Sequence, residues 1–151
     1  MLNRLTKLRE ERTERENGFT LIELLVVVVI IGILIAIAIP LYLNYQKGAN
    51  DKSAQSDVRG AVAVLEQCNS DNGSYPTGPT GAGAFVGTPT GCTGTVNVSK
   101  NSALTYAPNG VTPPTGYTLT GTNSSGSGKV YCYDSANGGA VTALTGGAIT
   151  C

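Results

Sequence analysis

Histidine and tryptophan are both missing from the 151 residues of the chain. Histidine is the commonest general base and the commonest nitrogen ligand of protein-bound metals, so its absence counts against metal-dependent and acid–base catalysis. The four cysteines include no Cys-x-x-Cys pair, which counts against zinc and thioredoxin-type sites. The sequence therefore predicts no enzyme, no metal site and no cofactor.

Charged residues are also scarce, and they are unevenly placed. They make up 13% of the chain, their net charge is zero, and nine of the twenty lie in residues 1–17. Residues 19–151 carry five basic and six acidic side chains, a net charge of −1. Because no basic stripe exists in that segment, a strong electrostatic contact with nucleic acid is not predicted, and only a weak DNA contact through a few lysines of an assembled array is left open.

Residues 24–43 contain no charged side chain and are almost entirely apolar, beginning Leu-Leu-Val-Val-Val-Val-Ile-Ile. Twenty residues span about 30 Å as a helix, which matches the hydrocarbon core of a bilayer. An ordinary secretory signal peptide would have a shorter apolar core followed by a small-residue cleavage site. No such site follows here, so we expect a transmembrane helix over about residues 21–43 that stays on the mature protein.

The helix is expected to continue beyond the membrane. Residues 49–70 lack proline, and their apolar side chains recur at steps of three and four, which places them on one helix face. We expect this apolar stripe to be buried against another part of the chain, and the residues after about 70 are the only candidate. The stripe consists of Ala54, Val58, Ala61, Val62, Leu65 and Cys68.

The last part of the chain changes character. Residues 73–151 hold 16 of the 20 glycines, six of the seven prolines and 15 threonines, with only three charged side chains. Short β-type runs separated by turn residues predict a small antiparallel sheet. These runs are residues 95–98, 116–120, 129–133 and 140–144. The alternative, a disordered Gly/Ser/Thr linker, is disfavoured by the tyrosines, valines and cysteines in them.

The informative motif covers residues 18–27, which read Gly-Phe-Thr-Leu-Ile-Glu-Leu-Leu-Val-Val, together with Pro40 further along the apolar run. It resembles the N-terminus of type IV pilins and their relatives, the pseudopilins. The resemblance implies an α+β fold in which a long N-terminal helix, half transmembrane and half amphipathic, packs on a small antiparallel sheet. It implies a leader over residues 1–18, a long helix over 19–70 and a Gly/Thr-rich β ectodomain over 71–151.

The resemblance also assigns roles to single residues. A prepilin peptidase would cut between Gly18 and Phe19, and the family typically methylates the new N-terminal residue, Phe19. Glu23 would neutralise that amino terminus during assembly, although an acid near a helix start can also simply reach the membrane interface. Pro40 would shape the curved or locally melted helix of the filament core; the simpler alternative is that it ends the transmembrane helix.

Four cysteines in a Gly/Ser/Thr-rich segment indicate two disulfides in an oxidising compartment, and three pairings are possible. We favour Cys68–Cys92, which would tie the helix end to the next loop, and Cys132–Cys151, which resembles the C-terminal disulfide loop of many pilins. The sequence alone leaves the pairing open.

Taken together, these features predict a structural pilin of a type IV pilus filament, serving adhesion, motility or DNA uptake. The expected partners are copies of itself, the prepilin peptidase, and an inner-membrane assembly platform with its ATPase. The precursor would span the cytoplasmic membrane once, and the assembled subunit would lie at the cell surface. The alternative is a minor pilin or pseudopilin of a type II secretion or competence system. A single-span membrane protein with a ligand-binding ectodomain ranks below both.

Overall fold

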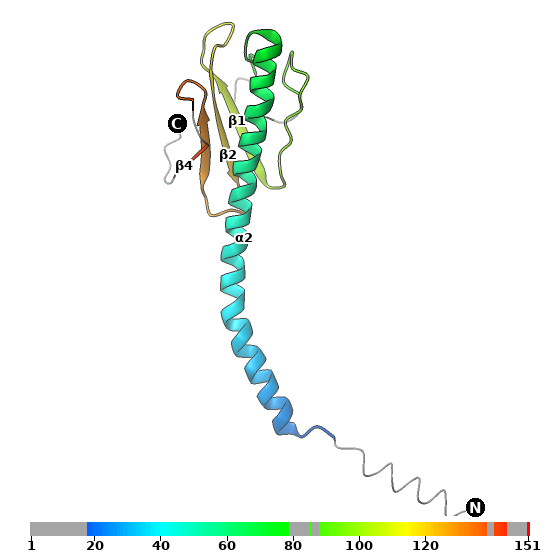
Figure 1. Cartoon of the computed structure of the whole chain (residues 1–151). Coiled ribbons are helices and arrows are strands. Elements are labelled where there is room, and N and C mark those ends of the chain that lie inside the picture. The colour runs from blue at the N-terminus through cyan, green and yellow to red at the C-terminus, as the bar shows by residue number, and fades with distance from the viewer. Residues whose placement is uncertain (1–17, 79–84, 86–87, 139–140, 145–150) are drawn as a thin grey trace, which may run out of the picture. The chain divides into compact units, whose positions relative to one another are not determined.

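The computed structural model describes residues 18–78, 85, 88–138, 141–144 and 151. Contacts between residues divide the chain into two compact units that meet between Tyr42 and Leu43. Helix α2 (Leu21–Asn72) begins in the first unit and continues into the second, which also holds a four-stranded sheet (Figure 1). The predicted α+β fold, a long helix and a small antiparallel sheet, is confirmed.

The sheet is an antiparallel meander in the order β1-β2-β3-β4, so each strand pairs with the next one along the chain. Its strands are β1 (Ser102–Pro108), β2 (Tyr117–Asn123), β3 (Val130–Asp134) and β4 (Thr142–Leu144). In β2 every second residue is buried, because alternate side chains point to opposite faces of a strand. One face of the sheet therefore supplies half of the core, and threonines occupy much of the other.

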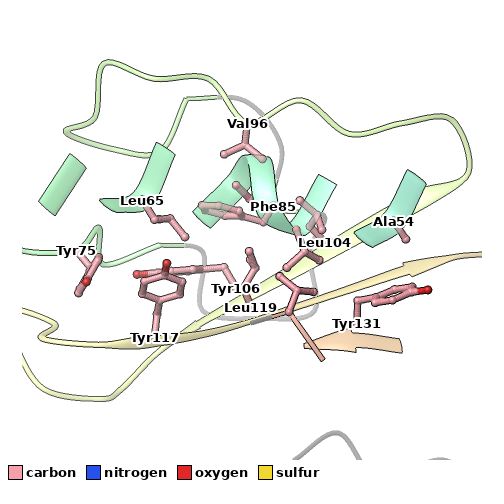
Figure 2. Close-up of a cluster of buried hydrophobic side chains, with 13 residues drawn as sticks. Ala54, Leu65, Tyr75, Phe85, Val96, Leu104, Tyr106, Tyr117, Leu119 and Tyr131 are labelled. Atoms are coloured by element: carbon pink, nitrogen blue, oxygen red, sulfur yellow. The ribbon is translucent and has the colours of Figure 1, made fainter. Parts of the chain in front are cut away.

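The core lies between this face and the predicted stripe of helix α2. The stripe residues Ala54, Val58, Ala61 and Leu65 are at most 1% exposed, which confirms the helical pattern seen in the sequence. Figure 2 shows the helix side chains pointing towards those of the strands, with an aromatic group at one end. A fully buried aliphatic side chain of this kind contributes about 1.5–3 kcal/mol relative to an exposed one.

Gly121 allows the helix to lie close to the centre of the sheet. It is buried on β2, and a Cβ atom there would collide with Cγ2 of Val58 and come within 3.3 Å of the Ala54 carbonyl oxygen. We therefore expect Gly121→Ala to lower the free energy of unfolding by about 1–3 kcal/mol, because the core would be overpacked. Urea unfolding measures this change.

A matched glycine provides the control for that substitution. Gly60 lies in helix α2, and in the described part of the chain a Cβ atom added there would meet no atom within 4 Å apart from its own stretch of the helix. Gly60→Ala should raise the free energy of unfolding by about 0.5–1 kcal/mol, since alanine loses less backbone entropy in a helix. Equal effects of the two substitutions would contradict the close approach at Gly121.

The observed strands differ from the sequence prediction in two places. Strand β1 was missed, although Leu104 and Tyr106 alternate with exposed neighbours in it. The strand expected at residues 95–98 was wrong: only Val96 forms a bridge, and the segment is otherwise irregular. This segment lies along helix α2 instead, where a Cβ at Gly94 would meet Val64 at 2.9 Å (Figure 1).

Two helix carboxylates fix the loops that lie beside the helix. Asp51 is 3% exposed; it accepts hydrogen bonds from the backbone N–H of Ser127 at 2.9 Å and from the Ser127 hydroxyl. Asp57, 9% exposed, accepts from the backbone N–H and the hydroxyl of Ser99 at 3.0 and 2.8 Å. Lys129 Nζ lies 3.9 Å from Asp51. These bonds hold the β2–β3 connection and the segment before β1 against helix α2, because a buried carboxylate needs such partners.

A third carboxylate joins the opposite part of the helix to the aromatic group. Glu66 accepts hydrogen bonds from the hydroxyls of Tyr75 and Tyr117, each at 3.0 Å. The Tyr106 hydroxyl donates to the Pro76 carbonyl oxygen at 2.7 Å. Burial raises the pKa of Tyr75 and of Tyr106 to about 12, and burial also raises the pKa of Tyr117.

These raised values predict a loss of stability at alkaline pH. A tyrosine in the unfolded chain has a pKa of about 10, so the folded state favours the neutral phenol. The resulting stabilisation is complete below about pH 10 and is lost as pH rises from about 10 towards 12. Urea midpoints measured from pH 9 to pH 12 should fall over this range. The fall should be shallower in Tyr106→Phe; an unchanged slope in that variant would contradict the assignment.

Candidate functional site

The predicted cleavage site lies directly before helix α2. Gly18 and Phe19 precede the helix, and both are exposed, Phe19 to 80%. Among the residues that the structure describes, none lies within 4 Å of the position that a Cβ atom on Gly18 would take. The described residues thus leave the Gly18–Phe19 bond exposed, as a protease requires, while the role of the bond stays a prediction.

The helix begins with a capping box formed by Thr20 and Glu23. The Glu23 carboxylate accepts hydrogen bonds from the backbone N–H and the hydroxyl of Thr20, at 2.8 and 2.7 Å. In return the Thr20 hydroxyl oxygen accepts from the backbone N–H of Glu23 at 3.3 Å. Such reciprocal bonds satisfy backbone donors that have no partner at a helix start. Glu23 is therefore held beside the residue that follows Phe19.

The apolar part of helix α2 presents its side chains outwards. Every large hydrophobic residue from Leu21 to Leu43 is exposed, and the stretch is long and apolar enough to cross a membrane. In water such a surface would be strongly unfavourable, at about 25 cal/mol per Å². This stretch therefore needs either lipid or other protein helices around it.

Pro40 lies inside helix α2, which runs without a break to Asn72. The alternative in which the helix itself ends at Pro40 does not hold, whereas the residue at which the helix leaves the membrane stays a prediction. A proline within a helix removes one backbone hydrogen bond, but neighbouring turns can keep the helix continuous. The role of Pro40 in a filament core stays a prediction.

The structure contains both cysteine pairs that the sequence analysis favoured. Cys68 and Cys92 are joined with an S–S distance of 2.01 Å, and Cys132 is joined to Cys151. The first pair fastens the end of helix α2 to the following loop, where Asn72 also donates a hydrogen bond to the Gly91 carbonyl oxygen at 2.8 Å. Among the described residues, no group of three or more His, Cys, Asp or Glu side chains could hold a metal ion.

Comparison with known proteins decides between the interpretations of this N-terminus. Residues 14–39 match the family model of the prokaryotic N-terminal methylation motif. The chain is also 37% identical over 94 residues to a type II secretion system core protein G of Pseudomonas aeruginosa. The chain belongs to the type IV pilin-like family. Prepilins with this motif are processed by prepilin peptidase and assemble into filaments, and the motif with the apolar helix indicates a membrane-anchored precursor.

Further relatives of this pilin-like chain are also type II secretion system core proteins G. Those of Dickeya chrysanthemi and of Escherichia coli K12 are 38% and 36% identical to it over 76 and 78 residues. The matches cover 66% of the Pseudomonas protein, 50% of the Dickeya protein and 54% of the Escherichia coli protein. The chain thus matches half to two thirds of the length of these relatives. No solved structure matches it.

Some contacts of this prepilin were not found from its sequence. The capping role of Thr20 was missed, although Thr-x-x-Glu before an apolar run is its usual signature. The buried acids Asp51 and Asp57 were also missed, since nothing local shows that distant serines will reach them. The sequence placed Gly18, Phe19 and Glu23 at one end of the apolar helix, and the structure places them there too.

Proposed function

We propose that this chain is a pseudopilin, a structural filament subunit of a type II secretion machine. The observation that carries the proposal is the similarity to several type II secretion core proteins G, which for the Pseudomonas protein covers 94 residues. The methylation motif covers only residues 14–39, so the similarity extends beyond the part that all members share. The relatives therefore favour the pseudopilin over the pilus subunit that the sequence alone suggested.

The proposed mechanism follows from the start of the apolar helix and from its exposed apolar side chains. Cleavage between Gly18 and Phe19 creates an amino group next to Thr20, and the Glu23 carboxylate is already held at Thr20 by two hydrogen bonds. Opposite charges close together in an apolar surrounding are far less costly than either alone. The exposed apolar side chains then exchange lipid for the helices of other copies. The chain itself performs no catalysis in this scheme.

A second candidate is the major pilin of a type IV pilus. The prepilin motif and the exposed apolar helix support it equally, because both kinds of filament use them. In this case the subunit would be abundant at the cell surface and would serve adhesion, motility or DNA uptake. Its location and abundance separate it from the pseudopilin.

Mass spectrometry of the parent cells tests the proposal. We expect a chain that begins at Phe19 in the cell envelope and is scarce in filaments sheared from the surface. Replacing Gly18 with leucine should leave residues 1–18 attached, because a side chain would hinder close approach of the protease to the backbone. An abundant chain beginning at Phe19 in the sheared material would favour the major pilin instead. An unmutated chain found only with its leader would contradict both.

A further inference from the structure

The exposed charges of the unit from Leu43 to Cys151 are separated along helix α2. All five basic side chains of this unit are exposed, and four of them lie in its part nearest Leu43, while Arg59 lies about midway along the helix stretch from Leu43 to Asn72. Two of them, Lys100 and Lys129, come from loops that lie beside this part of the helix. Lys129 Nζ lies 3.9 Å from Asp51. The Lys100 carbonyl oxygen accepts a hydrogen bond from Asn123, and Asn123 also donates to the Ser53 hydroxyl of the helix. The basic end consists of Lys47, Lys52, Lys100 and Lys129.

The acids in this region offset the basic surface only in part, through the ion pair of Asp51 with Lys129 at 3.9 Å. Asp51 and Asp57 are almost fully buried, and their oxygens are engaged by Ser127 and Ser99. Both acids act inside the fold, where they hold loops to the helix. The outer surface of this end is therefore basic.

The opposite end of the same unit is acidic. Glu66 and Asp71 are exposed on the last turns of helix α2. Asp134, at the end of strand β3, lies on the same side of the unit. It pairs with Thr118 of β2, and the neighbouring Tyr117 donates a hydrogen bond to Glu66. Residues 60–99, 101–128 and 130–151 contain no lysine or arginine. We name Glu66, Asp71 and Asp134 the acidic end.

We propose that the basic end of one copy contacts the acidic end of a second copy. This inference rests on the proposed filament, in which all copies point the same way. Two parallel copies at equal height would place like charges side by side. A displacement of about 28 Å along the helix axis, or the 19 residues from Lys52 to Asp71 at 1.5 Å each, brings the basic end of one beside the acidic end of the other.

These contacts set the axial register of neighbouring copies. Exposed ion pairs are individually weak, so the energy of assembly comes from the apolar helices. Complementary charges act mainly by excluding wrong arrangements, because like charges brought together are repelled. An anionic lipid headgroup could also attract the basic end, but it would not account for an opposite end that holds acids and no cation.

Zero-length cross-linking in the cell envelope tests the inference. A water-soluble carbodiimide joins a lysine amine directly to a carboxylate, so the two groups must touch. Lys52 and Asp71 are 19 residues apart on one helix, about 28 Å, and cannot touch within one copy. We expect mass spectrometry to find peptides that link Lys52 or Lys100 to Asp71 or Asp134, together with a ladder of oligomers.

Charge reversal supplies the second arm of the test. Asp71→Lys should reduce the oligomer ladder about fivefold, and adding Lys52→Glu to it should restore the ladder. The side chains of both residues are exposed, and each bonds only to a nearby glutamine of the helix. Asp71→Asn and Thr105→Lys each raise the net charge by one; only the first should weaken the ladder, because Thr105 is exposed on β1, which makes no part of either charged end.

The different failures are distinguishable. A ladder that is present but lacks these linked peptides and ignores Asp71→Lys would overturn the charge-matched contact and leave the filament proposal intact. Linkage that is absent while Lys52→Glu weakens binding of the full chain to phosphatidylglycerol vesicles would assign the basic end to lipid and overturn the inference. An unmutated chain that keeps residues 1–18 and forms no ladder would contradict the proposed function itself.

Discussion

Replacing Glu23 with alanine is expected to reduce the amount of assembled subunit about a hundredfold, because an unpaired amino terminus in an apolar core costs about 3 kcal/mol. The structure adds that Glu23 also caps the helix through Thr20. Two roles are therefore combined in one side chain: it supplies a negative charge, and it accepts hydrogen bonds at the helix start.

Glutamine separates these two roles. Glu23→Gln keeps an acceptor for the capping box but removes the charge. We expect it to assemble as poorly as the alanine variant, with cleavage at Phe19 unchanged in both. Thr20→Ala is the matched control, since it removes the cap and keeps the charge, and should cost only about 1 kcal/mol. The oligomer ladder in the envelope measures all three, and normal assembly of Glu23→Gln would show that Glu23 acts only as a cap.

Removing the Cys68–Cys92 pair should lower the free energy of unfolding by about 3 kcal/mol, because the bond closes a long loop. Serine at both positions would free the segment after helix α2, which holds Phe85 and Val96 in the core. Urea unfolding of the full chain in detergent checks this value.

Peptide mapping without reduction tests the pairing itself. It should yield Cys68 linked to Cys92 and Cys132 linked to Cys151. A peptide that links Cys68 to Cys132 would contradict this pairing. If the variant with serines at Cys68 and Cys92 unfolds at the same urea concentration as the unmutated chain, the predicted contribution of the Cys68–Cys92 disulfide to stability is contradicted.

The sequence predicted those features that depend on local pattern. The helix stripe from Ala54 to Leu65 follows from apolar residues at steps of three and four, and the transmembrane stretch follows from twenty residues without charge. The motif around Glu23 identified the family because its few residues occur together at fixed spacing.

Features that depend on distant parts of the chain could not be predicted. The run around Val96 is held along the helix by tertiary contacts that override its β propensity, whereas β1 carries a local alternation at Leu104 and Tyr106 that the sequence analysis overlooked. The burial of Asp51 depends on Ser127, 76 residues away. Nothing in the local sequence distinguishes Asp51 from an exposed acid.

The close packing of Gly121 against Val58 also has a consequence for the order of events during biosynthesis. Translation produces helix α2 first, and β2, which covers it, begins 45 residues after the helix ends. Contacts between such distant segments form late, since the intervening chain must first be closed into a loop. The apolar anchor is therefore available to the membrane before the outer unit can fold. A nascent chain that stalls before residue 117 would be anchored in the membrane but would lack the hydrophobic core. Its apolar helix stripe would then be exposed to chaperones and proteases.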